Sequence, residues 1–141
     1  MILLDSNVII DLLGNGGEWQ VWSQNAIVDA GTDEQLAVTP IVVAEVAPRV
    51  ESLDGFIERI ERFGASIVEL SNEAAYAAGT AFNLYRERRR NGDERARSII
   101  ADFLIGGQAL VLDAAIITRD ARFYRSYFPT VTLITPDKAE P

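Results

Sequence analysis

Residues 1–10 read MILLDSNVII, a short apolar run that ends at Asp5 and is followed by a second apolar stretch. Met1–Leu4 has the pattern of a buried β-strand, a continuous apolar run of strand length. Ser6 or Asn7 is then expected to cap a helix that continues to Leu13. A strand that leads directly into a helix is the unit from which α/β folds are built.

The same alternation of strand and helix continues along the chain. Further strands are expected at Leu36–Val38, Ser66–Leu70, Ala115–Thr118 and Val131–Ile134. Helices are expected at Glu18–Ala30, from Thr39-Pro40 to about Ala47, and at Leu53–Phe63, Asn72 to about Arg90, Ala96–Leu110 and Ala121–Phe128. This order predicts an α/β fold with a mostly parallel sheet, whose functional sites gather at the carboxyl ends of the strands. We expect a single domain over residues 1–141, with a polar tail from about residue 136.

The composition narrows the possible chemistry. The 141 residues include no cysteine and no histidine, which excludes disulfides, thiolate metal sites, histidine-based triads and imidazole zinc sites. Catalysis must therefore use carboxylates, hydroxyls, Lys or Arg, or a metal ion. No apolar run approaches the ~20 residues of a membrane span, and residues 1–10 lack the basic region of a secretion signal. With the absence of cysteine, this favours a cytoplasmic location.

The net charge of −8 argues against broad electrostatic binding of nucleic acid, which favours basic domains. A cluster of acidic metal ligands would account for part of this excess, and bound cations would neutralise some of it.

Two acids follow predicted strands. Asp5 ends the first strand, and Asp120 lies just past Ile116-Ile117-Thr118. The simpler interpretation of each is a helix N-cap, since aspartate is a favoured capping residue.

Two further acids lie on predicted helices. Glu45 follows Thr39-Pro40, and its simpler interpretation is a surface ion pair with Arg49, four residues on. At about 100° per residue, Asp102 shares a face with small or apolar residues: Ser98, Ile99, Ile105, Gly106 and Ala109. An unpaired carboxylate is costly to bury there, so either a cation or a buried arginine is expected beside it.

An α/β sheet can bring these four acids into one cleft. Hard divalent ions such as Mg²⁺ prefer oxygen ligands and keep several waters. A site of this kind activates water and stabilises the charge that develops on a phosphodiester, and it needs no histidine.

Four segments resemble, in order, the four motifs of PIN domains, most closely those of VapC-type toxins from bacterial and archaeal toxin–antitoxin pairs. They are Ile2–Ile9 (ILLDSNVI), Pro40–Glu45 (PIVVAE), Ala101–Ala109 (ADFLIGGQA) and Thr118–Tyr124 (TRDARFY). The resemblance spans the chain from residue 2 to about Pro136. All four motifs in order, in a chain of this length, form a specific pattern.

The resemblance implies a three-layer PIN-like fold with a central five-stranded sheet in the order 3-2-1-4-5. It implies a Mg²⁺- or Mn²⁺-dependent endoribonuclease, the toxin of a toxin–antitoxin pair, that forms a homodimer and is inhibited by a cognate antitoxin. It assigns metal binding and catalysis to Asp5, Glu45, Asp102 and Asp120, with Ser6 and Thr118 in supporting roles. Gly106-Gly107 departs from many relatives, which have alanine or a bulkier small residue there. Since each glycine costs about 1 kcal/mol in a helix, another element is expected to approach closely.

Two groups of arginines are candidates for binding substrate. Arg119 and Arg122 flank Asp120 and are expected to contact RNA or the antitoxin. A second group lies within residues 86–97, and its simpler interpretation is a solvated helix end. The functional alternative is an edge that guides RNA. Tyr124 and Tyr127 are expected in the core or an interface. The alternatives are a catalytically inactive PIN-like interaction module and a metal-dependent enzyme acting on DNA or on small phosphate esters.

Overall fold

The computed structural model describes residues 1–14, 17–88 and 96–136, with only the backbone of residues 96–99. Part of the predicted arginine group within residues 86–97 lies outside the described residues, namely Arg89, Arg90, Arg95 and the side chain of Arg97. The end of the polar tail lies outside them as well.

Five strands form one parallel sheet in the order β3-β2-β1-β4-β5, which confirms the predicted fold class and strand order. Their bounds are β1 Ile2–Leu4, β2 Leu36–Val38, β3 Ala65–Ile67, β4 Ala115–Ile117 and β5 Leu133–Ile134. The first strand is central, and its Leu3 pairs with Ala37 on one side and Ile116 on the other. The carboxyl ends of β1 and β4 are therefore neighbours, which brings the segments after them together.

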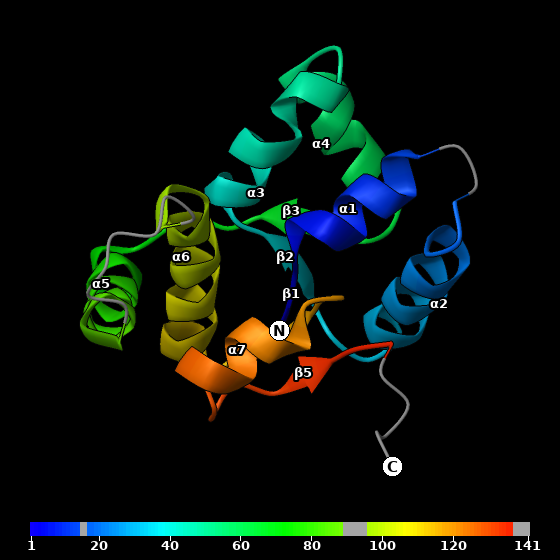
Figure 1. Ribbon diagram of the computed structural model, residues 1–141. Helices are drawn as coiled ribbons and strands as arrows, with labels where there is room; N and C mark the ends of the chain where they lie inside the picture. Colours follow the sequence, from blue (N-terminus) through cyan, green and yellow to red (C-terminus); the bar gives the residue numbers. More distant parts are fainter. Residues whose placement is uncertain (15–16, 89–95, 137–141) are drawn as a thin grey trace.

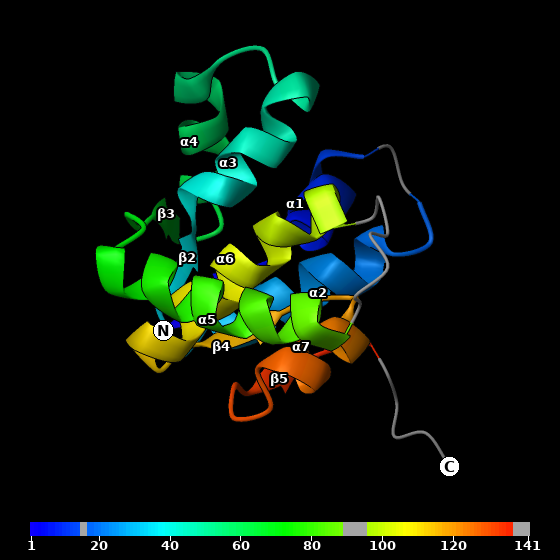
Figure 2. The ribbon, with the colours of Figure 1, turned by 60° about the vertical axis from the view of Figure 1, so that its left-hand side comes forward.

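Helices cover both faces of this sheet (Figure 1). They are α1 Ser6–Leu13, α2 Gln20–Gly31, α3 Pro40–Val46, α4 Leu53–Glu61, α5 Asn72–Arg88, α6 Ala96–Leu112 and α7 Ala121–Tyr127, with a short 3₁₀ helix at Ala47–Arg49. The first four lie on one side of the sheet, and α5, α6 and α7 lie on the other. Figure 2 shows α5 and α6 packed side by side as a hairpin.

Local signals begin the helices near the site. Thr39 caps α3, because its hydroxyl accepts hydrogen bonds from the backbone N–H groups of Ile41 and Val42, and Pro40 occupies the first turn as predicted. The prediction that Ser6 or Asn7 caps α1 is wrong. Asp5 is the cap, and its carboxylate accepts the Ser6 backbone N–H. The residue that ends the central strand thus also starts the next helix.

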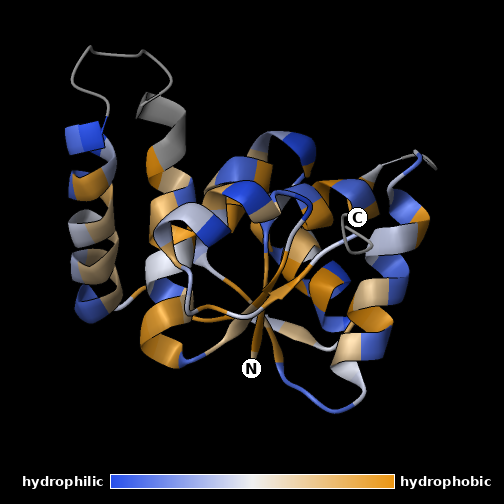
Figure 3. Ribbon diagram, turned by 60° about the horizontal axis from the view of Figure 1, so that its bottom comes forward, coloured by the Kyte–Doolittle hydropathy of each residue, from blue (hydrophilic) through white to orange (hydrophobic). Residues whose placement is uncertain are grey.

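The core lies between the sheet and its helices, and Figure 3 shows the strands at its centre as mainly hydrophobic. Leu3, Leu36, Ile116 and Phe103 are fully buried. None of the helices in the described ranges is both long and apolar enough to cross a bilayer.

Two glycines of α6 permit close contact with neighbouring segments. A Cβ on Gly107 would lie 2.5 Å from the backbone oxygen of Ala74 on α5, and a Cβ on Gly106 would overlap the ring of Phe128. The close approach predicted from Gly106-Gly107 is therefore confirmed.

Candidate active site

Asp5 is the most enclosed of the four predicted acids, with 2 % of the residue exposed. Its Oδ1 accepts the Ser6 backbone N–H at 2.7 Å. Its Oδ2 accepts the Thr118 hydroxyl at 2.7 Å and the Tyr124 hydroxyl at 3.0 Å. Burial raises the pKa of Asp5 despite these hydrogen bonds, which favour the ionised form. Three donors, from the start of α1, the segment after β4 and α7, thus fix this carboxylate in place.

Glu45 and Asp102 face the same region from α3 and α6. Partial desolvation of the Glu45 carboxylate raises its pKa, and the charge of Asp5 adds to this effect, while a hydrogen bond with Ser6 opposes it. Asp102 is half-buried, and burial, followed by the charges of Asp5, Glu45 and Asp120, raises its pKa to about 7. The carboxylate of Asp102 therefore senses all three other predicted acids.

Asp120 occupies the position before α7, but its side chain makes no capping hydrogen bond. Its backbone N–H instead donates to the Thr118 hydroxyl at 2.9 Å, which leaves the exposed carboxylate outside the helix. The charge of Asp120 contributes to the raised pKa values of Asp5, Asp102 and Tyr124. The four acids, which come from two strand ends and two helices, form one electrostatically coupled group.

The simpler interpretations of the four acids fare differently. Asp5 does cap a helix, but Asp120 does not use its side chain to do so. Glu45 forms no ion pair with Arg49, and no arginine or lysine among the described residues pairs with Asp102. In the described part of the chain, the acids thus repel one another with no cation of the protein between them.

The fit of a metal ion depends on how many direct ligands the ion needs. Among the described residues, no three acidic side chains converge closely enough to hold one ion together. Mg²⁺ usually takes only one or two protein carboxylates and fills its other positions with water. The donor set of four coupled carboxylates therefore suits a hydrated divalent ion better than one enclosed by protein ligands.

The two arginines beside Asp120 have different environments. Arg122 is exposed on the first turn of α7. Arg119 donates through Nε and a terminal nitrogen to the two oxygens of Asp11, at 2.8 and 3.0 Å. The Asp11 side chain is only 10 % exposed and is held in this pair, so it is not a solvated acid of the α1 surface.

Sequence reasoning missed two residues next to Asp5. Tyr124 is buried as expected, but its hydroxyl also serves the site. Asn7 donates through Nδ2 to the Thr118 hydroxyl at 3.3 Å, and its Oδ1 accepts the Arg119 backbone N–H at 3.1 Å. Asn7 could have been suspected from the sequence, because it lies two residues after Asp5 on the first turn of the predicted helix.

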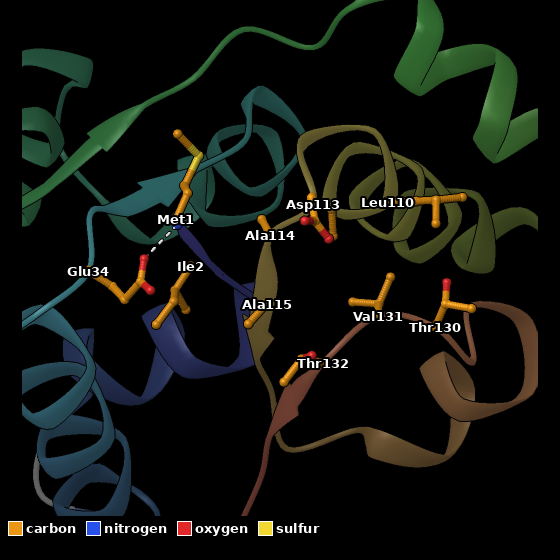
Figure 4. Close-up of a pocket in the computed structure, with 11 residues that line it drawn as sticks. Met1, Ile2, Glu34, Leu110, Asp113, Ala114, Ala115, Thr130, Val131 and Thr132 are labelled. Carbon is orange, nitrogen blue, oxygen red and sulfur yellow. Dashed lines mark hydrogen bonds and ion pairs between the residues drawn. The ribbon is translucent and has the colours of Figure 1, made fainter.

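A cavity that the described residues line lies at the opposite edge of the sheet. It has a volume of about 450 Å³ and includes Met1 and Ile2 of the β1 segment and Ala114 and Ala115 at the start of β4. Figure 4 shows the ion pair between the Met1 ammonium group and Glu34 at its rim. Because Asp5 and Asp120 follow the carboxyl ends of these two strands, the cavity does not belong to the site of the four acids.

Comparison with models of known protein families identifies the family of this chain. Residues 2–129 match the model of the PIN domain. The chain belongs to the PIN domain family. A comparison with proteins of curated function finds no match.

Solved structures show the same fold. This PIN domain is similar to VapBC2 from Rickettsia felis bound to a DNA fragment from its promoter, with 17 % identity and a TM-score of 0.68 over 97 % of this chain and 100 % of that chain. It is also similar to VapBC-1 from nontypeable Haemophilus influenzae, with 20 % identity and a TM-score of 0.67 over 96 % and 98 %. A toxin–antitoxin complex from Klebsiella pneumoniae gives 19 % identity and a TM-score of 0.63 over 98 % and 99 %.

Proposed function

We propose that this PIN domain is a divalent-metal-dependent endoribonuclease, the toxin of a toxin–antitoxin pair. The observation that carries the proposal is the coupling of Asp5, Glu45, Asp102 and Asp120. Each of the first three has a raised pKa to which at least one other member of the group contributes. Uncompensated negative charge of this kind is a typical setting for a bound cation.

A divalent ion bound among these carboxylates supplies a Lewis acid for the phosphodiester and activates a water molecule. The protein's part is to hold the oxygen donors in place. Asp5 is the fixed member, because Ser6, Thr118 and Tyr124 all donate to it. Asp102 is the member whose proton must leave, since its pKa lies near 7 before a cation binds.

The similarity to toxin–antitoxin complexes supports a protein partner for this PIN domain. We propose an RNA substrate, inhibition by a cognate antitoxin, a homodimer and a cytoplasmic location. Arg122 is the candidate phosphate contact beside the acids, because it is exposed and carries no ion pair among the described residues. The bound cation also offsets part of the net charge of −8 that otherwise opposes RNA binding.

Cleavage of single-stranded RNA by the purified protein tests the proposal. We expect cleavage with Mg²⁺ or Mn²⁺ and none with excess EDTA. Asp102→Asn should abolish it, whereas Asp29→Asn, which removes an exposed acid of α2, should not. Full activity in EDTA, or equal activity of the two variants, would contradict the mechanism. Cleavage of single-stranded DNA in place of RNA would instead reassign the substrate.

A further inference from the structure

The turn between β4 and α7 is held from the side by an arginine. Arg119 donates two hydrogen bonds to Asp11 of α1, and Asp11 also accepts the hydroxyl of the fully buried Ser23 of α2 at 2.7 Å. The Arg119 guanidinium carbon lies 5.4 Å from the centre of the Trp19 ring. We call Arg119, Asp11, Ser23 and Trp19 the Arg119 clamp.

The same helix also holds the backbone of this turn. Asn7 and Asp11 are four residues apart and so lie on one face of α1. Asn7 accepts the Arg119 backbone N–H and donates to the Thr118 hydroxyl, while Asp11 holds the Arg119 side chain. One face of α1 therefore fixes the main chain and the side chain of the turn together.

The next residue along the turn is Asp120. Its backbone N–H donates to Thr118, whose hydroxyl in turn donates to Asp5. Because the Asp120 side chain makes no capping bond, the position of its carboxylate depends on the backbone on either side. The Arg119 clamp holds the N-terminal side of this residue, and α7 holds the other.

We propose that Arg119 is a positioning residue, which acts through Asp11 to hold Asp120 beside Asp5 and Asp102. The inference rests on the proposed function, since it concerns the binding of the cation by the same carboxylates. It assigns Arg119 to the support of the site, whereas Arg122 remains the candidate for contact with phosphate. Residues that hold metal ligands in place typically change metal affinity about 10-fold or more when they are removed.

The sign of the effect separates positioning from simple electrostatics. Arg119→Met removes a positive charge near the acids, so Coulomb attraction alone would make Mn²⁺ bind more tightly. Loss of positioning would make it bind more weakly. We expect the dissociation constant for Mn²⁺, measured by electron paramagnetic resonance, to rise about 10-fold in Arg119→Met. Arg119→Lys, which keeps the charge but not the two-pronged contact, should give an intermediate value.

A second measurement needs no metal. The backbone N–H of Arg119 donates a hydrogen bond to Asn7, and that of Asp120 donates one to Thr118. The hydrogen exchange of these two groups in the metal-free protein therefore measures directly how well the turn is held. We expect faster exchange at both residues in Arg119→Met and in Asp11→Asn, measured by NMR below the melting temperature of each variant. Glu58→Gln is the matched control, because it breaks the exposed Arg62–Glu58 pair of α4 and should change neither measurement.

The outcomes are decisive for this inference. Equal or tighter Mn²⁺ binding by Arg119→Met overturns it, and so does unchanged exchange at Asp120. Should Arg119→Met fail to fold, Asp11→Asn and Arg119→Lys give the same two measurements. If the wild type binds Mn²⁺ but cuts no RNA, the proposed function fails, while both measurements still decide the role of Arg119.

Discussion

The carboxylate of Asp102 connects the acidic site to the stability of the molecule. In the metal-free protein its pKa is about 7, against 3.8 in the absence of its surroundings. Between these values the folded state binds a proton that the unfolded state has released, so the free energy of unfolding falls as pH rises from about 4 to about 7. The loss attributable to Asp102 is at most about 4 kcal/mol and is complete above pH 7.

Chemical denaturation of the metal-free protein between pH 4 and pH 8 measures this loss. The difference between the wild type and Asp102→Asn isolates the contribution of one carboxylate, since the amide does not titrate. We expect the wild type to lose stability relative to the variant as pH rises. A wild type that gains stability relative to Asp102→Asn over this range would show that Asp102 is held as an anion by a cationic partner.

The individual residues also show how far sequence reasoning reaches. The places of the four acids, after two strands and on two helices, could be predicted because strands and helices have periodic apolar patterns. Their role as metal ligands stays a prediction. The pairing of Arg119 with Asp11 could not be predicted, because it joins residues 108 positions apart and depends on how α1 is rotated against the β4–α7 turn. The hydroxyl of Tyr124 was missed for a related reason. Its aromatic ring fits a core position equally well whether or not the hydroxyl meets a carboxylate.

The contact between α5 and α6 depends on a glycine. In Gly107→Ala, the new Cβ would lie 2.5 Å from a backbone oxygen and 2.8 Å from a backbone nitrogen of α5, so the two helices must separate. We expect a loss of about 1–3 kcal/mol in the free energy of unfolding, the usual cost of overpacking. Gly79→Ala on α5 is the matched control. It meets nothing within 4 Å and should gain about 0.5–1 kcal/mol. Equal effects of the two substitutions in urea denaturation would refute this account of the helix pair.

Elements were predictable where their signals are local. Thr39-Pro40 starts α3 as expected, and the five predicted strands all occur. The cap of α1 was assigned one or two residues too late, because Asp5, Ser6 and Asn7 are all good capping residues. The folded backbone shows which of the three is the cap, because Asp5 is extended and the helix begins at Ser6.

The distribution of charge over the whole molecule sets how RNA can approach an acidic protein. Arg122 is exposed beside the acids, whereas Arg119 is paired with Asp11. We expect Arg122→Ala to lower the slope of log affinity against log salt concentration by about 0.7, the value for one phosphate contact with a single strand. Fluorescence anisotropy of labelled RNA in EDTA measures this slope. Arg62→Ala, at the exposed C-cap of α4, changes the net charge equally and is the control. Identical slopes for both variants would remove Arg122 from the binding surface.

Thermal melting of the wild type, Asp102→Asn and Asp5→Asn, each in EDTA and in Mg²⁺, tests most directly whether the four carboxylates form a cation site. In EDTA, Asp102→Asn should be at least as stable as the wild type, because it removes one of four repelling charges. Mg²⁺ should raise the melting temperature of the wild type through its binding to the folded state, and raise it less in both variants. A strongly destabilised Asp102→Asn in EDTA, with an unchanged response to Mg²⁺, would contradict the account.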